Sequence, residues 1–323
     1  MPLEINKISK RFGNKWALRD VSFEVSDGSV VGIFGASGSG KSTLLNIIAG
    51  TIKSSGGTVV VDGIDITKQK PKERGISLHI GHGEGGLKGL LDGVFAKGAG
   101  GEIQLSRFEK TSNDTRKIWL LDEPFSEMDA GQRERCFVDI RKAAQTTGRT
   151  IFFASSDFQQ IIELTDEVAV IDEGEIVQTG TPQEIYEEPG SVKIARTTGD
   201  NNLIVARRLS SSDDQIPEFY TIDGAHRIFA QPIEKGRLGA INQNVTLAIR
   251  PEQIAMSMGA SFPEDNLLKG VVTAIKFRGA STLIEFDAGG LTLETRVFKV
   301  VGLKVGDECM LGLPPHRIIV LRN

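Results

Sequence analysis

One short stretch of the sequence decides the fold, and it reads Gly35-Ala36-Ser37-Gly38-Ser39-Gly40-Lys41-Ser42-Thr43. The apolar run Val30–Phe34 before it predicts a buried strand, and the run Thr43–Ala49 after it, closed by Gly50, predicts a helix. The stretch fits the pattern G-x-x-x-x-G-K-[ST] in the strand-to-helix setting that this pattern requires. Its glycines let main-chain N–H groups curl around a phosphate at the positive end of a helix. We therefore expect a phosphate-binding loop.

The same stretch carries side chains suited to a nucleoside triphosphate and its metal ion. We expect Lys41 to reach the β- and γ-phosphates and the Ser42 hydroxyl to ligate Mg²⁺. The residues expected to bind the nucleotide here are Gly35, Ser37, Gly38, Ser39, Gly40, Lys41, Ser42 and Thr43.

A second apolar run ends in two acidic residues. Ile118–Leu121 reads as a buried parallel strand and is followed by Asp122 and Glu123. On its own, this pattern would indicate a strand that meets solvent. Beside a phosphate loop, it places Asp122 as a Mg²⁺ ligand and Glu123 as the group that orients or deprotonates the attacking water. The expected reaction is hydrolysis of ATP to ADP and phosphate, with Glu123 and Lys41 as catalytic residues.

Two regions of different character follow one another along the chain. From the start to about residue 200, apolar runs alternate with helical patterns, which predicts an α/β domain with a mostly parallel sheet. Beyond it, short strand patterns separated by Gly, Asp and Pro predict a small β-barrel or sandwich. These strands are Val245–Ile249, Val271–Phe277, Leu283–Phe286, Leu291–Val297 and Arg317–Leu321. The sequence thus predicts two domains, 1–200 and 201–323.

Composition narrows the class of protein. Apolar residues at 39% and charged residues at 25% are normal for a globular chain, and a net charge of −4 argues against electrostatic binding of nucleic acid by the whole chain. The two cysteines are far apart and give no metal or disulfide framework. No uncharged apolar run reaches the ~20 residues that a membrane span needs, so we expect any membrane role to be peripheral.

These residues resemble the ABC ATPase family. The run Leu121–Asp129 looks like that family's Walker B motif followed by its D-loop, and Gly98–Glu102 falls where its Leu-Ser-Gly-Gly-Gln signature belongs. Phe12 matches the aromatic residue that stacks on adenine in the family, although a lone Phe could equally be a core residue.

The second half of the chain resembles one subgroup of that family. The run Glu167–Glu188 is similar to the end of importer ATPases of the maltose, polyamine and iron type, and Arg250–Glu252 and Gly270–Val297 resemble their C-terminal TOBE domain. The resemblance implies a P-loop NTPase domain of the ABC ATPase type, followed by an all-β, OB-like TOBE domain. OB-like barrels often bind nucleic acid, but the mixed charges and the lack of a basic aromatic patch here lead us to expect no such partner.

The resemblance implies a function and partners. The chain is expected to use ATP and Mg²⁺ to power solute import, as a peripheral subunit on the cytoplasmic face of the membrane, bound to membrane-spanning permease subunits. In the family, two ATP-binding subunits sandwich two ATP molecules, so a second subunit is expected, in a homodimer or an unequal heterodimer. The residues implied to face the partner's ATP are Gly100, Gly101, Glu102, Ser126 and Asp129.

The sequence departs from the family pattern in three places. The helical subdomain is shortened to about 75–98, and the family's Gln aligns with Gly81. The family's switch His aligns with Ser156, and the signature Ser aligns with Ala99. One interpretation is tolerated drift. The alternative is a degenerate, weakly hydrolysing subunit that pairs with a more active ATPase and has a regulatory or structural role.

Overall fold

The computed structural model describes residues 3–81, 102, 104–105, 108–109, 114–208, 217–232, 241–259, 264–300 and 302–321. The chain divides into two compact units, Met1–Ile185 and Tyr186–Asn323. The sequence placed the domain boundary near residue 200, whereas the two units divide within helix α6 (Pro182–Glu187). Each unit has its own hydrophobic core.

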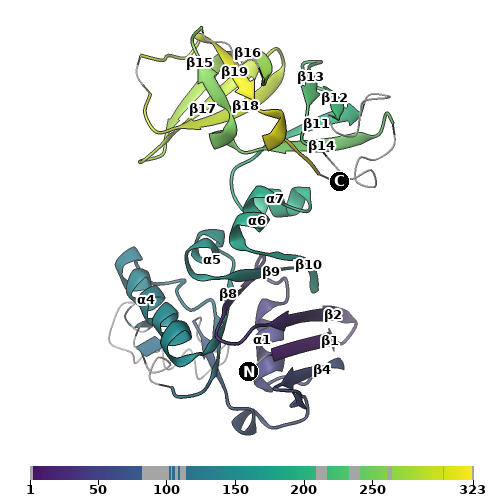
Figure 1. Ribbon diagram of the computed structural model, residues 1–323, viewed down its shortest axis with the longest axis vertical. Helices are drawn as coiled ribbons and strands as arrows, with labels where there is room; N and C mark the ends of the chain where they lie inside the picture. The colour runs from purple at the N-terminus through teal and green to yellow at the C-terminus, as the bar shows by residue number, and fades with distance from the viewer. Residues whose placement is uncertain are drawn as a thin grey trace. The chain divides into compact units, whose positions relative to one another are not determined.

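The first unit contains two β-sheets (Figure 1). An antiparallel four-stranded sheet has the order β2-β1-β4-β5, and a six-stranded sheet has the order β10-β9-β3-β8-β7-β6. From β9 to β6 the larger sheet is parallel, and β10 pairs antiparallel with β9. The strands are β1 (Leu3–Phe12), β2 (Lys15–Val25), β3 (Val30–Phe34), β4 (Gly56–Val61), β5 (Ile64–Asp65), β6 (Ile76–Ile80), β7 (Ile118–Asp122), β8 (Thr150–Ser155), β9 (Glu167–Asp172) and β10 (Glu175–Gly180).

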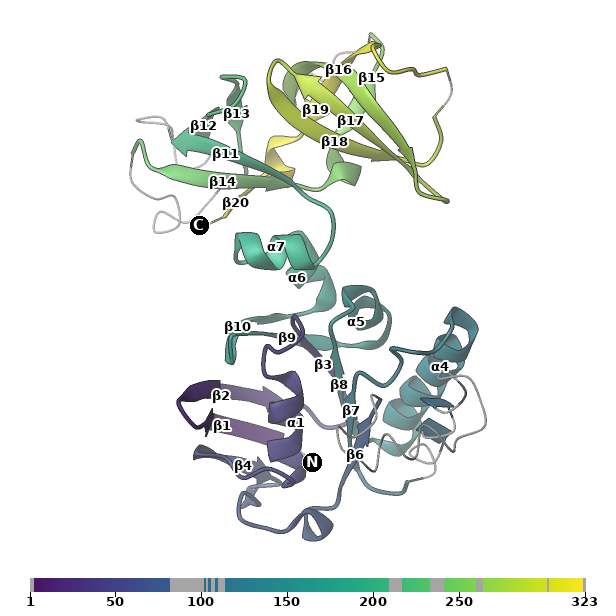
Figure 2. The ribbon, with the colours of Figure 1, turned by 180° about the vertical axis from the view of Figure 1, so that it is seen from behind.

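Helices cover the parallel sheet on both sides. Helix α1 (Lys41–Ala49) lies between the two sheets, where its buried residues join those of both sheets in one core (Figures 1 and 2). Helices α4 (Ala130–Thr147) and α5 (Phe158–Leu164) lie on the opposite side of the parallel strands (Figure 2). Aromatic rings pack these helices against the sheet. For example, the ring centroids of Phe34 in β3 and Phe158 in α5 lie 4.9 Å apart. The predicted α/β architecture with a mostly parallel sheet is confirmed.

The elements around the phosphate loop begin and end as the sequence predicts, with one difference. Strand β3 has the predicted bounds, and Gly50 ends α1 in a left-handed conformation at φ +81°. The helix begins at Lys41 rather than Thr43, because Gly40 takes φ +117° at the N-cap and turns the chain directly into the helix.

Arg74 anchors the far end of α1. The side chain is 9% exposed, and its guanidinium donates to the carbonyls of Ile47 and Ile48, both at 2.8 Å. The remaining donors reach the carbonyls of Thr67 at 2.6 Å and Gln69 at 3.1 Å. The last carbonyls of a helix have no intrahelical partner, and a guanidinium with five donors is well suited to satisfy several of them at once. Arg74 thus fixes α1 against the chain segment that leads into β6.

The second unit is built from two antiparallel five-stranded sheets that share one core. Their orders are β13-β12-β11-β14-β20 and β15-β19-β16-β17-β18. The strands are β11 (Asn202–Arg208), β12 (Glu218–Thr221), β13 (Arg227–Phe229), β14 (Asn244–Ile249), β15 (Ala255–Ser257), β16 (Asn266–Phe277), β17 (Thr282–Ala288), β18 (Leu291–Val297), β19 (Glu308–Leu313) and β20 (Ile319–Leu321). The five strands expected from the sequence are all present, and β16 is longer than expected. The strand expected over Arg317–Leu321 begins at Ile319, because Pro315–Arg317 forms a 3-10 turn.

Helix α7 (Val192–Thr197) and the start of the second unit are tied to its sheets by Arg250. The Arg250 guanidinium is buried, lies 3.7 Å from the Tyr186 ring centroid, and donates to the Tyr186 carbonyl at 2.6 Å and to Thr198 Oγ1 at 2.9 Å. The Tyr186 hydroxyl in turn donates to Glu252 at 2.5 Å. Burial, together with this neighbouring carboxylate, raises the pKa of Tyr186 to about 12. The Arg250–Glu252 motif therefore has a structural role.

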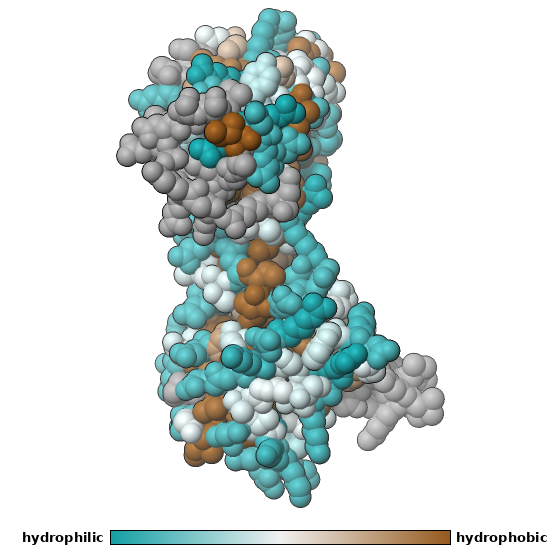
Figure 3. Space-filling view, turned by 90° about the vertical axis from the view of Figure 1, so that its right-hand side faces the viewer, coloured by the Kyte–Doolittle hydropathy of each residue, from teal (hydrophilic) through white to brown (hydrophobic). Residues whose placement is uncertain are grey.

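The surface drawn in Figure 3 is mainly hydrophilic, and hydrophobic residues form small separate groups on it. Among the described residues, no helix is both long and apolar enough to cross a bilayer. Cys136 and Cys309 are buried and free, and burial raises the pKa of both thiols, to about 12 for Cys136. Both thiols are therefore protonated at neutral pH.

Replacing Arg74 by Met is expected to destabilise the first unit by about 3 kcal/mol, because several buried carbonyls lose a charged donor. Arg135→Met, an exposed site on α4, is the matched control and should change stability by less than about 0.5 kcal/mol. Urea unfolding followed by circular dichroism measures both. Equal stability of the two variants would contradict the anchoring role of Arg74.

Candidate functional site

The phosphate loop lies against neighbouring strands more closely than any residue other than glycine allows. A β-carbon at Gly35 would lie 2.2 Å from the Ile171 carbonyl oxygen of β9, and one at Gly40 would lie 2.8 Å from the Ala17 carbonyl oxygen of β2. The loop is also tied down by main-chain hydrogen bonds, Ser39 N to Ala36 O at 3.1 Å and Gly174 N to Ser39 O at 2.9 Å. This packing fixes the loop at the N-terminus of α1, where main-chain N–H groups favour anions.

Lys41 lies at the centre of the loop. Its ammonium donates to the carbonyls of Gly35 at 2.7 Å and Ala36 at 3.1 Å, and Nζ lies 3.4 Å from Glu123 Oε1. The Lys41 side chain is only 5% exposed and that of Glu123 is 23% exposed. The structure thus brings the two residues predicted as catalytic into one ion pair, although they lie on different elements.

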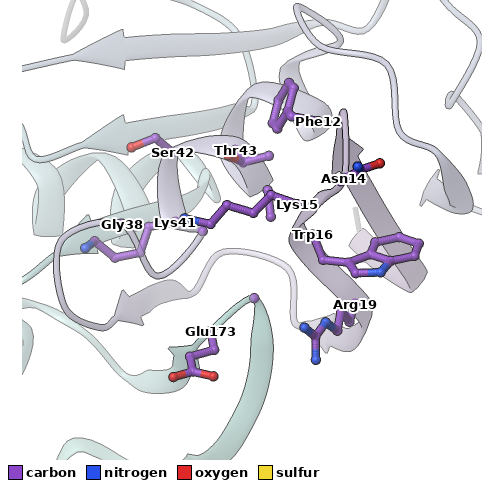
Figure 4. Close-up of a pocket in the computed structure, with 13 residues that line it drawn as sticks. Phe12, Asn14, Lys15, Trp16, Arg19, Gly38, Lys41, Ser42, Thr43 and Glu173 are labelled. Carbon is purple, nitrogen blue, oxygen red and sulfur yellow. The ribbon is translucent and has the colours of Figure 1, made fainter.

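A cavity of about 980 Å³ opens beside this ion pair (Figure 4). Its lining comes from the end of β1, the start of β2 and the turn between them, from the phosphate loop and the start of α1, and from the turn between β9 and β10. The lining residues are Phe12, Asn14, Lys15, Trp16, Ala17, Arg19, Gly38, Gly40, Lys41, Ser42, Thr43, Glu173 and Gly174. Of the other residues predicted for the nucleotide, Gly35, Ser37 and Ser39 belong to the same loop but are not in this lining. The volume suits a ligand of nucleotide size.

Phe12 is not a core residue. It lies at the end of β1, is 51% exposed and lines the cavity, with Lys10 Nζ 4.8 Å from its ring centroid. Trp16, 40% exposed, lines the same cavity, whereas the sequence predicted a core or edge aromatic rather than a ligand platform. The core alternative left open for Phe12 is therefore excluded.

Strand β7 delivers the acidic pair to the same edge of the sheet. Asp122 is the last residue of β7 and is 4% exposed. Glu123 follows with φ +44°, a left-handed conformation that costs a residue other than glycine about 1–2 kcal/mol, and its N–H donates to the Ala154 carbonyl at 3.0 Å. Strained backbone held in place by its surroundings is typical of functional sites.

The residues predicted to face a partner are only partly described. Gly100 and Gly101 lie outside the described residues, as does Ala99, while Glu102 is helical and exposed. Asp129 caps α4 by accepting from Gln132 N at 2.8 Å. The Ser126 hydroxyl donates to the Glu123 carbonyl at 3.4 Å.

Gly81, which aligns with the family's Gln, lies too close to neighbouring main chain to carry a side chain. Gly81 follows β6, and its N–H donates to the Asp122 carbonyl at 2.8 Å. A β-carbon there would lie 1.9 Å from the Glu123 carbonyl oxygen and 2.7 Å from the Pro124 Cα. A glutamine at this position would collide with the main chain of Glu123. Most of the shortened segment 75–98 lies outside the described residues.

Ser156, which aligns with the family's switch His, lies beside a network of polar side chains at the end of β8. Ser156 is exposed. Next to it, the Ser155 hydroxyl donates to Gln160 Oε1 at 3.2 Å and accepts from Asp157 N at 3.1 Å, while Gln160 Nε2 donates to Asp157 Oδ2 at 3.1 Å. These bonds fix the turn after β8 without a histidine.

One further residue near the acidic pair was missed by sequence reasoning. Gln104 is 1% exposed and hydrogen-bonds to Gly81, Ser126 and Glu127. No local pattern reveals such a residue, because its partners lie about twenty positions away on both sides.

The loop fits a triphosphate on two structural grounds. At Gly35 and Gly40 a β-carbon would meet main-chain oxygens, so the glycines are needed for the loop to take its shape. Ser39 Oγ is buried and has no hydrogen-bond partner among the described residues. Ser42 and Asp122, at the start of α1 and the end of β7, carry the hydroxyl and carboxylate oxygens that Mg²⁺ accepts.

Comparison with known proteins identifies both regions. Residues 18–83 match the model of the ABC transporter family, and residues 247–321 match that of the TOBE domain. A spermidine/putrescine import ATP-binding protein PotA from Clostridioides difficile is 26% identical, with 99% of this chain and 98% of that protein aligned. The chain thus carries a region that matches the ABC transporter family, followed by one that matches the TOBE domain.

Other relatives agree with this ABC transporter assignment. A maltose/maltodextrin import ATP-binding protein MalK from Yersinia pestis is 27% identical, with 99% of this chain and 95% of that protein aligned. Among solved structures, a nucleotide-free ATP-binding cassette from an ABC transporter aligns with a TM-score of 0.52 at 23% identity, over 62% of this chain and 100% of that one. An ABC cassette in its ADP conformation aligns with the same TM-score and identity. These structures establish that the first unit has the ABC cassette fold.

Placing the family's glutamine at Gly81 is expected to harm this protein. Gly81→Gln should destabilise the first unit by about 3 kcal/mol, because the new side chain forces the Glu123 main chain to move. Gly56→Gln is the matched control, since nothing lies within 4 Å of a β-carbon there. Thermal unfolding with equal midpoints for the two variants would contradict the steric explanation.

Proposed function

We propose that this ABC transporter subunit binds ATP at the loop Gly35–Thr43 and hydrolyses it to power solute import. The observation that carries the proposal is the Lys41–Glu123 pair, with Nζ and Oε1 3.4 Å apart at the N-terminus of α1 and beside a cavity of nucleotide size. A phosphate-binding cation and a candidate base therefore meet at one place. The relatives named as import ATP-binding proteins support the same function.

The binding step uses groups already directed toward the cavity. Main-chain N–H groups of the loop and the positive end of α1 would surround the β-phosphate. Lys41 would exchange its carbonyl partners for phosphate oxygens, and the exposed ring of Phe12 would stack on the base.

The hydrolytic step follows from the position of Glu123. Its carboxylate would accept a proton from water as the water oxygen attacks the γ-phosphorus and the bond to the β–γ bridging oxygen breaks, which leaves ADP and phosphate. Ser42 and Asp122 would hold Mg²⁺, which supplies positive charge to the phosphate oxygens. Lys41 would stabilise the negative charge that develops on the transferred group.

Coupling to transport requires other chains. We propose membrane-spanning permease subunits and a second ATP-binding subunit as partners, with the chain bound peripherally at the cytoplasmic face of the membrane. Glu102 is exposed and Ser126 lies in the loop after the acidic pair, so both suit contacts with the second subunit. No comparison supports the alternative of a degenerate, weakly hydrolysing partner subunit.

Lys41→Ala is expected to weaken ATP binding by about 10- to 100-fold, because hydrogen bonds from a charged donor are worth about 1.5–3 kcal/mol. Lys72→Ala, on an exposed turn, is the control and should bind like the wild type. Calorimetric titration with ATP and Mg²⁺ measures both. Unchanged affinity in the Lys41 variant would refute the phosphate-binding role of this loop.

Glu123→Gln should leave nucleotide affinity within about twofold of the wild type, while kcat falls by about 10²–10⁴ through loss of the base. Release of phosphate under saturating ATP gives kcat. Turnover at the wild-type rate would show that Glu123 is not the base.

A further inference from the structure

Gln104 has a buried side-chain amide that hydrogen-bonds to two separate chain segments near the acidic pair. Its Nε2 donates to the Gly81 carbonyl at 3.1 Å and to Ser126 Oγ at 3.0 Å, and its Oε1 accepts from Glu127 N at 2.9 Å. The side chain is 1% exposed. The amide thus joins the end of β6 to the loop that follows Glu123.

An apolar contact accompanies this amide. Gln104 and Phe108 are both helical and lie four positions apart in the chain. Phe108 is 1% exposed, and its ring centroid lies 5.7 Å from that of Phe125, which is also fully buried. Both residues therefore contact the loop Glu123–Glu127, one by hydrogen bonds and one by ring packing.

The loop held in this way carries Glu123. Ser126, which accepts from Gln104, donates to the Glu123 carbonyl at 3.4 Å, and Gly81 packs directly on the same carbonyl. Glu123 keeps a left-handed φ of +44° within these contacts. A strained residue retains its conformation only when its surroundings fix it. The Gln104 amide hydrogen-bonds to Ser126 and Gly81, the two residues that contact the Glu123 carbonyl.

We propose that Gln104 is a positioning residue for Glu123, which it holds in place through Ser126, Glu127 and Gly81. Gln104 follows Glu102, an exposed residue proposed to face the second subunit, by two positions in the chain. This inference rests on the proposed ATPase function. It assigns to Gln104 an effect on the chemical step and not on nucleotide binding.

The test compares Gln104→Glu with Asn266→Asp, both in the full chain. Asn266 is 6% exposed, donates to the carbonyls of Phe229 and Leu313, and accepts from Phe229 N, so the two amides match in burial and bonding. Only Gln104 contacts the ATPase site. We expect both variants to lower the melting temperature, but only Gln104→Glu to lower kcat, at least about tenfold, with the affinity for ATP and Mg²⁺ within twofold.

A pH series separates positioning from general damage. Protonation of the introduced carboxyl restores one donor, so the kcat of Gln104→Glu relative to wild type should rise as the pH falls, while Asn266→Asp should show no such change in relative kcat. A relative kcat that stays flat with pH, or a wild-type kcat in Gln104→Glu, would overturn the role of Gln104. Wild-type protein that neither binds nor hydrolyses ATP would instead overturn the proposed function, and this inference with it.

Discussion

The close approach of the phosphate loop to β9 and β2 is the constraint on which the site depends. Only glycine at positions 35 and 40 lets the main chain lie against the carbonyls of Ile171 and Ala17. That approach aims the first turn of α1 and the Lys41 ammonium at the cavity. Arg74 fixes the other end of the same helix, so α1 is held at both termini. The binding site is therefore a property of the packed first unit rather than of an isolated loop.

Parallel strands bring the remaining groups to the same edge of the sheet. The carboxyl ends of β3, β6, β7 and β8 carry the loop, Gly81, the acidic pair and the Ser155 network in turn. Ligand sites commonly form at this edge of α/β sheets. The departures at Gly81 and Ser156 fit this arrangement, because the first allows close packing on Glu123 and the second lies beside a turn that is already hydrogen-bonded.

Much of this arrangement could be predicted from local sequence. The glycine pattern with its flanking strand and helix, the apolar run that ends at Asp122, and the capping residue Asp129 each carry a signal within a few residues. Gln104 and Arg74 could not be found in this way, because their partners are brought near only by the folded chain. The strands β11, β12, β13, β15 and β19 were likewise not predicted individually, since short strands in a β-rich unit depend on their neighbours for stability.

The central claim is that the Gly35–Thr43 loop holds the triphosphate of ATP. A crystal structure with a non-hydrolysable ATP analogue and Mg²⁺ tests this claim most directly. We expect the β- and γ-phosphates within the loop, with Lys41 Nζ moved from the carbonyls of Gly35 and Ala36 onto phosphate oxygens. An analogue bound elsewhere, with Lys41 still on those carbonyls, would contradict the claim.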